Sequence, residues 1–208
     1  MYAPRAELKV KVFYDYICPF CYIGSERLLR LNNDYDLKVD WTGMEIHPET
    51  PAQGMPLAQL GYPPAQWSRM TAALEQMAKQ EDIELGAREF TTNSHKALLL
   101  SEAAKQAGQD VFDALHKRLF QAFFSEGKNI GDEKVLMELA QEAGLSQETI
   151  AAAWQDPRFE QVLNQNLGLA AKLGIHGTPT FIIGKEILVG AVPYEDLQEA
   201  ANGASRGK

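Results

Sequence analysis

The two cysteines of this 208-residue chain, Cys18 and Cys21, stand three positions apart. A thiol reacts as its thiolate, and a cysteine with a pKa of about 8.5 is only about 3% ionised at pH 7. A C-x-x-C pair can exchange disulfides, because one thiolate attacks a substrate and the other thiol resolves the mixed disulfide. A structural bridge closing so short a loop would add little stability. The pair is therefore the first candidate for a reactive centre.

The residues around the pair predict the turn from strand to helix that this chemistry needs. Residues 10–14 are β-branched and aromatic, which predicts a strand, and a helical pattern continues to residue 31. Cys18 then lies at a helix N-terminus, where free backbone N–H groups and the helix dipole favour a thiolate. Pro19 suits the first helical position. We expect Cys18 to be the nucleophile and Cys21, one turn further on, to be the resolving thiol.

The rest of the chain predicts one α/β unit interrupted by helices. A second strand is expected over 37–41, and residues 48–64 are a Pro- and Gly-rich loop. The pattern is helical without strand signals from about 65 to 160, with Asp110 and Asp132 as plausible N-caps. Another helix and a hairpin over 180–189 follow. We expect residues 1–62 and 159–208 to form the α/β unit and residues 63–158 to be an inserted helical domain.

A second element that can contribute to a site is Gly177–Thr178–Pro179–Thr180, which precedes the predicted hairpin. Proline cannot donate to a sheet ladder, so it belongs at a strand start or edge. A plain loop-ending proline fits this position. A cis-proline, which is rare and usually has a purpose, fits it equally.

A strand followed by C-P-x-C, with a Gly-Thr-Pro segment before a hairpin, resembles the DsbA-like branch of the thioredoxin superfamily. The resemblance is closer still to the FrnE-like proteins, and it spans nearly the whole chain. The segments that carry it are Asp15–Gly24, Thr92–Leu98, Gly174–Phe181, and Gly190–Ala191 followed by Glu195. The resemblance implies a thioredoxin fold with a large all-helical insertion, in the α/β class.

The resemblance also implies which residues surround the cysteines. Pro179 should be cis, with its loop facing the pair and the backbone of Thr178 pairing with an extended substrate segment. The insertion should cover the pair, so that His95 and Asn93 are candidates to line a substrate groove, and His176 is a candidate to border it. For any one of these residues, a surface histidine near a helix N-terminus is the simpler explanation.

The dipeptide between the cysteines is Pro19–Phe20, where the better-known DsbA oxidants have Pro-His. A cationic histidine helps to hold a thiolate, and Phe20 cannot, so we do not expect a strong oxidant. Pro19 and Phe20 are candidate substrate contacts. Tyr16 and Tyr22 are candidates for the same apolar collar, although core packing also explains Tyr16. Asp15 would oppose ionisation of the first cysteine if it faced the sulfur, and otherwise it is a polar strand end.

Composition narrows the function classes. A net charge of −8 disfavours nucleic-acid binding, which depends on Lys and Arg. No segment approaches the roughly 18–20 apolar residues that span a bilayer, so no membrane partner is expected. The first ten residues lack the apolar core of a signal peptide, which predicts a cytoplasmic protein. The chain is expected to be a monomer or a homodimer.

We therefore expect a thiol–disulfide oxidoreductase or isomerase that acts on protein or small-molecule thiols and disulfides, with glutathione as a candidate redox partner. No bound cofactor and no metal are expected, because a zinc site needs two more ligands and His47, His95, His116 and His176 are not suitably spaced. Two alternatives stay open. One is a glutathione-dependent transferase or isomerase of the kappa type, against which two intact cysteines count. The other is a non-catalytic, chaperone-like binding module.

Overall fold

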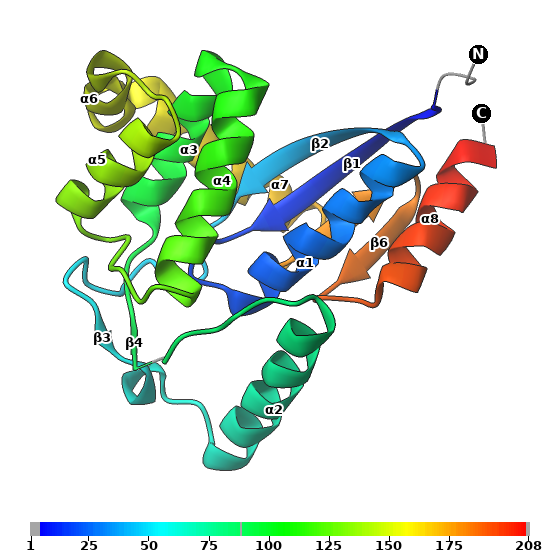
Figure 1. Cartoon of the computed structure of the whole chain (residues 1–208), viewed down its shortest axis with the longest axis horizontal. Coiled ribbons are helices and arrows are strands. Elements are labelled where there is room, and N and C mark those ends of the chain that lie inside the picture. The colour runs from blue at the N-terminus through cyan, green and yellow to red at the C-terminus, as the bar shows by residue number, and fades with distance from the viewer. Residues whose placement is uncertain (1–4, 88, 207–208) are drawn as a thin grey trace.

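The structure is a computed structural model that describes residues 5–87 and 89–206. At its centre is a four-stranded sheet in the order β2-β1-β5-β6 (Figure 1). β1 (Glu7–Tyr14) runs parallel to β2 (Asp36–Gly43) and antiparallel to β5 (Thr180–Ile183), and β5 forms a hairpin with β6 (Glu186–Val189). Strands from the two ends of the chain thus share one sheet. Gly184 has a φ of 61° at the hairpin turn, a backbone conformation that glycine adopts without steric cost.

Helices cover both faces of this sheet. α1 (Pro19–Leu29) links β1 to β2 and lies with α8 (Tyr194–Arg206) on one face, whereas α7 (Pro157–Lys172) lies on the other (Figure 1). The alternation of β1 explains this layering, because successive side chains point to opposite faces. Val12 joins the main core, and its neighbour Phe13 packs with residues of α7.

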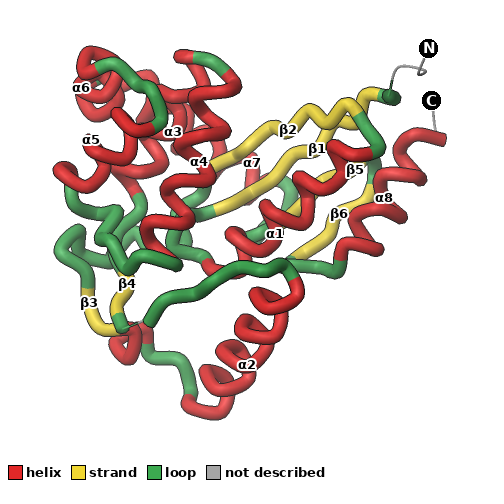
Figure 2. The backbone as a smooth tube through the Cα atoms, viewed as in Figure 1, coloured by secondary structure: helices red, strands yellow, loops and turns green. Residues whose placement is uncertain are grey.

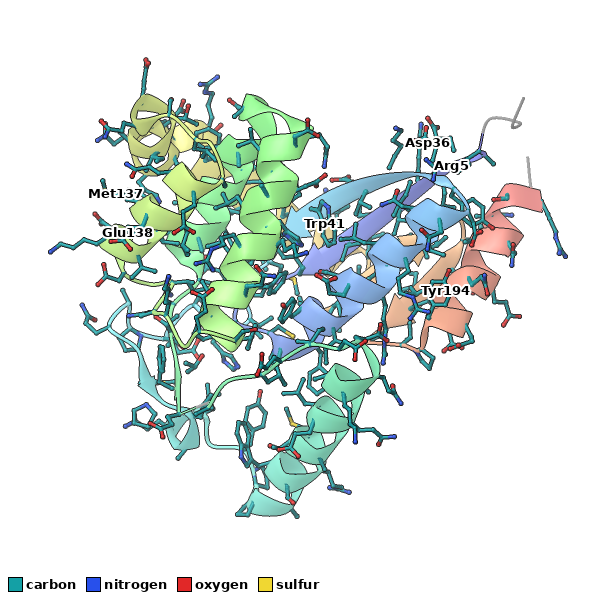
Figure 3. All side chains as sticks on the ribbon, viewed as in Figure 1. Arg5, Asp36, Trp41, Met137, Glu138 and Tyr194 are labelled. Atoms are coloured by element: carbon teal, nitrogen blue, oxygen red, sulfur yellow. The ribbon has the colours of Figure 1, made fainter. Side chains whose placement is uncertain are left out.

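The helical block packs beside the end of β2. Its members are α3 (His95–Ala107), α4 (Gln109–Phe124), α5 (Glu133–Glu142) and α6 (Gln147–Gln155). Trp41 of β2, labelled in Figure 3, joins the block to the sheet. Its ring centroid lies 4.2 Å from that of His116 on α4. Asp132 caps α5 as predicted, but the cap predicted at Asp110 is wrong. The N-cap of α4 is Gly108, two residues before the predicted one, so Asp110 lies inside the first turn of the helix.

A small second sheet was not predicted from the sequence. β3 (Met55–Pro56) pairs antiparallel with β4 (Phe90–Thr91), inside segments expected to be a loop and purely helical (Figure 2). Strands of two residues carry no period that a sequence pattern could show. A short 3₁₀ turn, Leu57–Leu60, leads from β3 towards α2.

α2 (Pro64–Gln80) stands apart from the other helices as an arm (Figure 1). Only Leu74 and Ala78 of this helix are buried. Its C-terminal end is fixed, because the buried guanidinium of Arg27 on α1 donates to Glu81 at 2.7 Å and to the backbone carbonyls of Ala191 and Val192 at 2.8 and 3.0 Å. The N-terminal half of α2 contains no buried residue.

Candidate active site

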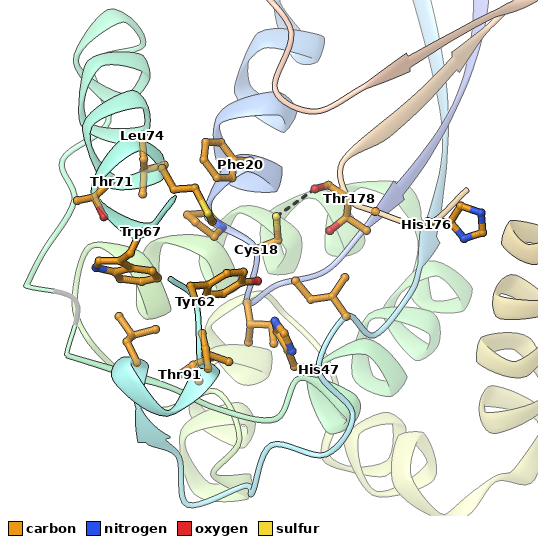
Figure 4. A pocket seen from close by; sticks show the side chains of 17 residues that line it. Cys18, Phe20, His47, Tyr62, Trp67, Thr71, Leu74, Thr91, His176 and Thr178 are labelled. Atoms are coloured by element: carbon orange, nitrogen blue, oxygen red, sulfur yellow. Dashed lines mark hydrogen bonds between the residues drawn. The ribbon is translucent and has the colours of Figure 1, made fainter. Parts of the chain in front are cut away.

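The cysteine pair lies where β1 passes into α1. Cys18 is the N-cap of α1, with φ −90° and ψ 111°, and Pro19 follows as the first helical residue. Both thiols are free and buried, with Cys18 4% exposed and Cys21 fully enclosed. The Cys18 thiol donates to the backbone carbonyl of Thr178 at 3.4 Å (Figure 4), and the Thr178–Pro179 peptide bond is cis. The fold therefore brings both sequence-predicted elements together.

The surroundings of the two sulfurs push their pKa values in opposite directions. A hydrogen bond from the Cys21 thiol lowers the pKa of Cys18, with smaller contributions from the Thr178 hydroxyl and the Cys21 backbone N–H, while burial and Asp15 oppose them. Burial raises the pKa of Cys21 well above its usual range, and the neighbouring Cys18 raises it further. Cys18 is thus the thiol that ionises, and Cys21 stays protonated beside it.

The hydroxyl of Thr178 is placed to donate a hydrogen bond to the Cys18 thiolate. Its Oγ1 is buried and has no hydrogen-bond partner, yet it lies close enough to both cysteines to lower their pKa values. A buried hydroxyl without a partner is costly, and a thiolate would supply the missing acceptor. The hydrogen bond from the Cys18 thiol to the Thr178 carbonyl exists only while Cys18 is protonated. When Cys18 ionises, it is replaced by a hydrogen bond from the Thr178 hydroxyl to the thiolate.

Replacing this hydroxyl should move the pKa of Cys18. Thr178→Val keeps the shape of the side chain and removes the donor, so we expect the pKa of Cys18 to rise and its alkylation to shift to higher pH. Thr178→Ser, which keeps the hydroxyl, is the matched control. The rate of iodoacetamide alkylation against pH measures the shift, and a midpoint unchanged in the valine variant would contradict the assignment.

Asp15 is a buried carboxylate held by backbone donors. Its oxygens accept from the N–H of Ile46 at 2.8 Å and of Ile17 at 3.3 Å. Burial, the largest influence, raises the pKa of Asp15 to about 6, and its charge in turn raises the pKa of Cys18. The question left open by the sequence is thereby answered: the carboxylate is anchored to the backbone, and its charge still acts on the sulfur.

Asp15→Asn should lower the pKa of Cys18, because it removes a negative charge that disfavours the thiolate. The difference from wild type should be present above about pH 6, where Asp15 is ionised, and should vanish below it, where Asp15 is already neutral. Alkylation rates across this pH range measure it, with Asp34→Asn at an exposed position as control. An equal shift in both variants, or a rise in the pKa of Cys18, would be inconsistent with this role.

A cavity of about 330 Å³ opens beside Cys18, within the size range of small-molecule and side-chain pockets (Figure 4). Five segments contribute to its wall: the start of α1, the loop after β2, α2 with the turn before it, β4 through Thr91, and the loop of Thr178. Of the sequence-predicted residues, it is lined by Cys18, Pro19, Phe20, His176 and Thr178.

The other candidate residues lie elsewhere. His95 is outside the lining of this cavity, with Nδ1 bonded to Glu45 and Nε2 2.9 Å from Glu160. Tyr16 points into the core, where its hydroxyl bonds Ser101 and His116, and Tyr22 stacks on a core phenylalanine. Of the proposed aromatic collar, only Phe20 borders the cavity.

Two aromatic residues of the cavity were missed by the sequence analysis. Tyr62 and Trp67 line it from α2 and its approach, together with Met70 and Leu74. The helical spacing of Trp67, Met70 and Leu74 shows one apolar face, which is ordinarily core. What distinguishes this face is that Trp67 and Met70 are half-exposed, whereas Leu74 is buried. This exposure depends on how α2 is placed in the fold and cannot be predicted from the spacing.

A C-x-x-C pair at the first turn of α1, facing a cis-proline loop within a β2-β1-β5-β6 sheet that carries inserted helices, defines a DsbA-like thioredoxin fold. The chain belongs to this family: the DSBA-like thioredoxin domain matches residues 9–202. The narrower FrnE-like assignment stays a prediction. In the described residues, no cluster of three or more His, Cys, Asp or Glu side chains is arranged to hold a metal ion.

Comparison with individual proteins supports this family assignment. The chain is 28% identical over 200 residues to YwbO, an uncharacterised protein of Bacillus subtilis (strain 168), covering 96% of this chain and 98% of that one. It superposes on a probable DsbA oxidoreductase from Streptomyces coelicolor with a TM-score of 0.85 and 24% identity, over 97% and 91% of the two chains. The cytosolic disulfide reductase DsbM from Pseudomonas aeruginosa, solved with GSH, gives a TM-score of 0.67 and 20% identity over 96% of each chain. The two structural likenesses establish the fold.

Proposed function

We propose that the protein is a thiol–disulfide oxidoreductase that exchanges disulfides with protein or small-molecule substrates through Cys18. The observation that carries the proposal is the opposed ionisation of the pair: Cys18 has a lowered pKa at the edge of a cavity, and Cys21 has a raised pKa in the interior behind it. This is the arrangement that an attacking thiolate and a resolving thiol require.

In the reducing direction, the Cys18 thiolate attacks one sulfur of a substrate disulfide. A bond forms between Cys18 and that sulfur, the substrate S–S bond breaks, and the other substrate sulfur leaves as a thiolate. Cys21 then loses its proton and attacks Cys18, which releases the second substrate thiol and leaves a Cys18–Cys21 disulfide. Two electrons have passed to the substrate, and an external dithiol or glutathione restores the pair. Oxidation of a substrate runs the same steps backwards.

We place this activity in the cytoplasm and assign it a reducing or isomerising direction. We expect a strong oxidant to hold its thiolate with a nearby cation. Phe20 supplies no such cation to the Cys18 thiolate. None of the helices in residues 5–87 and 89–206 is long and apolar enough to cross a membrane. One structural neighbour, DsbM, is described as a cytosolic disulfide reductase, and this supports the same location.

Turnover of a peptide disulfide tests the proposal. A peptide with a fluorophore and a quencher joined by a disulfide should be cleaved catalytically in the presence of a reductant, and Cys18→Ser should abolish the catalysed rate. A wild-type rate no greater than that of the reductant alone would overturn the proposed function.

A further inference from the structure

We infer that the cavity beside Cys18 selects polypeptides with an uncharged aromatic or large apolar residue next to the reacting cysteine, and that it discriminates against glutathione. The inference rests on the proposed function and adds the substrate class. Its recognition element is α2, an arm to which neither the redox chemistry nor the family match assigns a role.

The first observation is an aromatic wall opposite the reactive sulfur. The rings of Tyr62 and Trp67 stack with centroids 6.1 Å apart and an interplanar angle of 28°. Both line the cavity with Phe20, and Figure 4 shows them on the side of Cys18 away from His176. These side chains are only half-buried, so an apolar residue entering the cavity would remove their exposed surface from water.

The second observation is the charge of the lining. Apart from Cys18 and the phenol of Tyr62, its only titratable side chains are His47 and His176, and it contains neither Lys nor Arg. His47 lies 3.3 Å from the carboxylate of Glu49, and His176 is exposed at the rim. Glutathione carries a carboxylate on each side of its cysteine, and burying a carboxylate without a cationic partner is costly. The net charge of −8 adds repulsion at longer range.

The third observation favours a polypeptide over a small thiol. A second hollow shares Phe20 and Thr178 with the first and continues to Val189 and Gly190, and it too is lined without a charged side chain. The two hollows therefore adjoin at Phe20 and Thr178. β6 is an edge strand of the sheet, and its Val189 is 67% exposed. An extended chain with apolar residues on both sides of its cysteine would occupy both hollows, whereas a small thiol would occupy one.

The fixed end of α2 keeps the aromatic wall in place. Arg27 anchors the C-terminal end of the arm through Glu81, and Leu74 and Ala78 pack against α1 and its surroundings. Trp67 lies in the other half of the helix, where only partial burial holds it. Truncating its side chain should therefore alter recognition without disturbing the cysteines.

The test compares two disulfide substrates of the wild-type protein and its variants. One is the symmetric disulfide of a short neutral peptide that has tryptophan beside its cysteine. The other is glutathione disulfide. We expect kcat/KM to favour the aromatic peptide, and Trp67→Ala to lower kcat/KM for that peptide by about 10- to 100-fold, the range found when one apolar group is lost from a pocket. Glutathione disulfide should change less than about twofold. Gln66→Ala, exposed on the same helix, should change neither.

Preference of the wild type for glutathione disulfide, or an equal loss for both substrates in Trp67→Ala, would overturn the inference. Calorimetric binding of the same peptide with its cysteine S-methylated separates this outcome from failure of the chemistry. Binding that is selective for the aromatic peptide and is lost in Trp67→Ala, in a protein that turns over no disulfide, would overturn the proposed function and support the selection. Equal binding of the peptide and S-methylglutathione would overturn the selection itself.

Discussion

Cys21→Ser should convert the protein into a trap for its substrates. In this variant Cys18 still attacks a disulfide, but no thiol is left to resolve the mixed disulfide, so the covalent adduct accumulates. Cys18→Ser should form no adduct, because Cys21 is fully enclosed and burial holds its pKa well above the usual range. Loss of either cysteine should lower catalysed exchange by at least about 10³-fold, as expected for residues that act as a unit.

Non-reducing gels and intact mass after incubation with a disulfide peptide distinguish the two variants. The adduct should appear in Cys21→Ser, disappear on adding dithiothreitol and be absent from Cys18→Ser. Adducts of equal yield in both variants would contradict the assignment of Cys18 as the attacking thiol.

Arg27→Met should destabilise the protein by about 3–5 kcal/mol, the usual cost of breaking a buried ion pair from one side. The side chains of Arg27 and Glu81 are 4% and 9% exposed, and the guanidinium also holds two backbone carbonyls. Its loss leaves the Glu81 carboxylate buried with only the exposed Arg30 as a partner, and it releases the end of α2.

Urea unfolding followed by circular dichroism measures this loss. Arg27→Met combined with Glu81→Met should recover part of it, because no uncompensated charge stays buried. Arg158→Met, which breaks the surface pair with Asp156, should cost less than about 1 kcal/mol. A loss for Arg27→Met as small as that of the surface control would contradict the anchoring role.

The cysteine chemistry and the sheet could be predicted because their signals are local. A β-branched run followed by Cys18–Pro19 specifies a strand turning into a helix, and Pro179 before a second such run specifies the start of another strand. That the two meet is a property of the topology, and here the resemblance to the DsbA-like branch supplied what the residue pattern alone left open.

The environment of the pair could not be predicted, because it depends on contacts distant in sequence. The buried state of Asp15 depends on the N–H of Ile46, 31 residues away. The sequence makes His95 a candidate for the groove, but two glutamates from other segments bind both of its ring nitrogens. Trp67 has the spacing of a core residue, and its half-exposed position follows from the placement of α2. In each case the sequence identifies the residue type but not the residues that contact it in the fold.

Redox titration of the Cys18–Cys21 pair tests the central claim most directly. The protein is equilibrated in glutathione buffers of stepped composition, free thiols are trapped by alkylation, and the reduced fraction is read by mass. We predict one reversible two-electron transition that joins Cys18 to Cys21, at a potential more reducing than about −180 mV, since Phe20 supplies no cation to favour the reduced form. Two thiols that show no reversible transition across the series would contradict it.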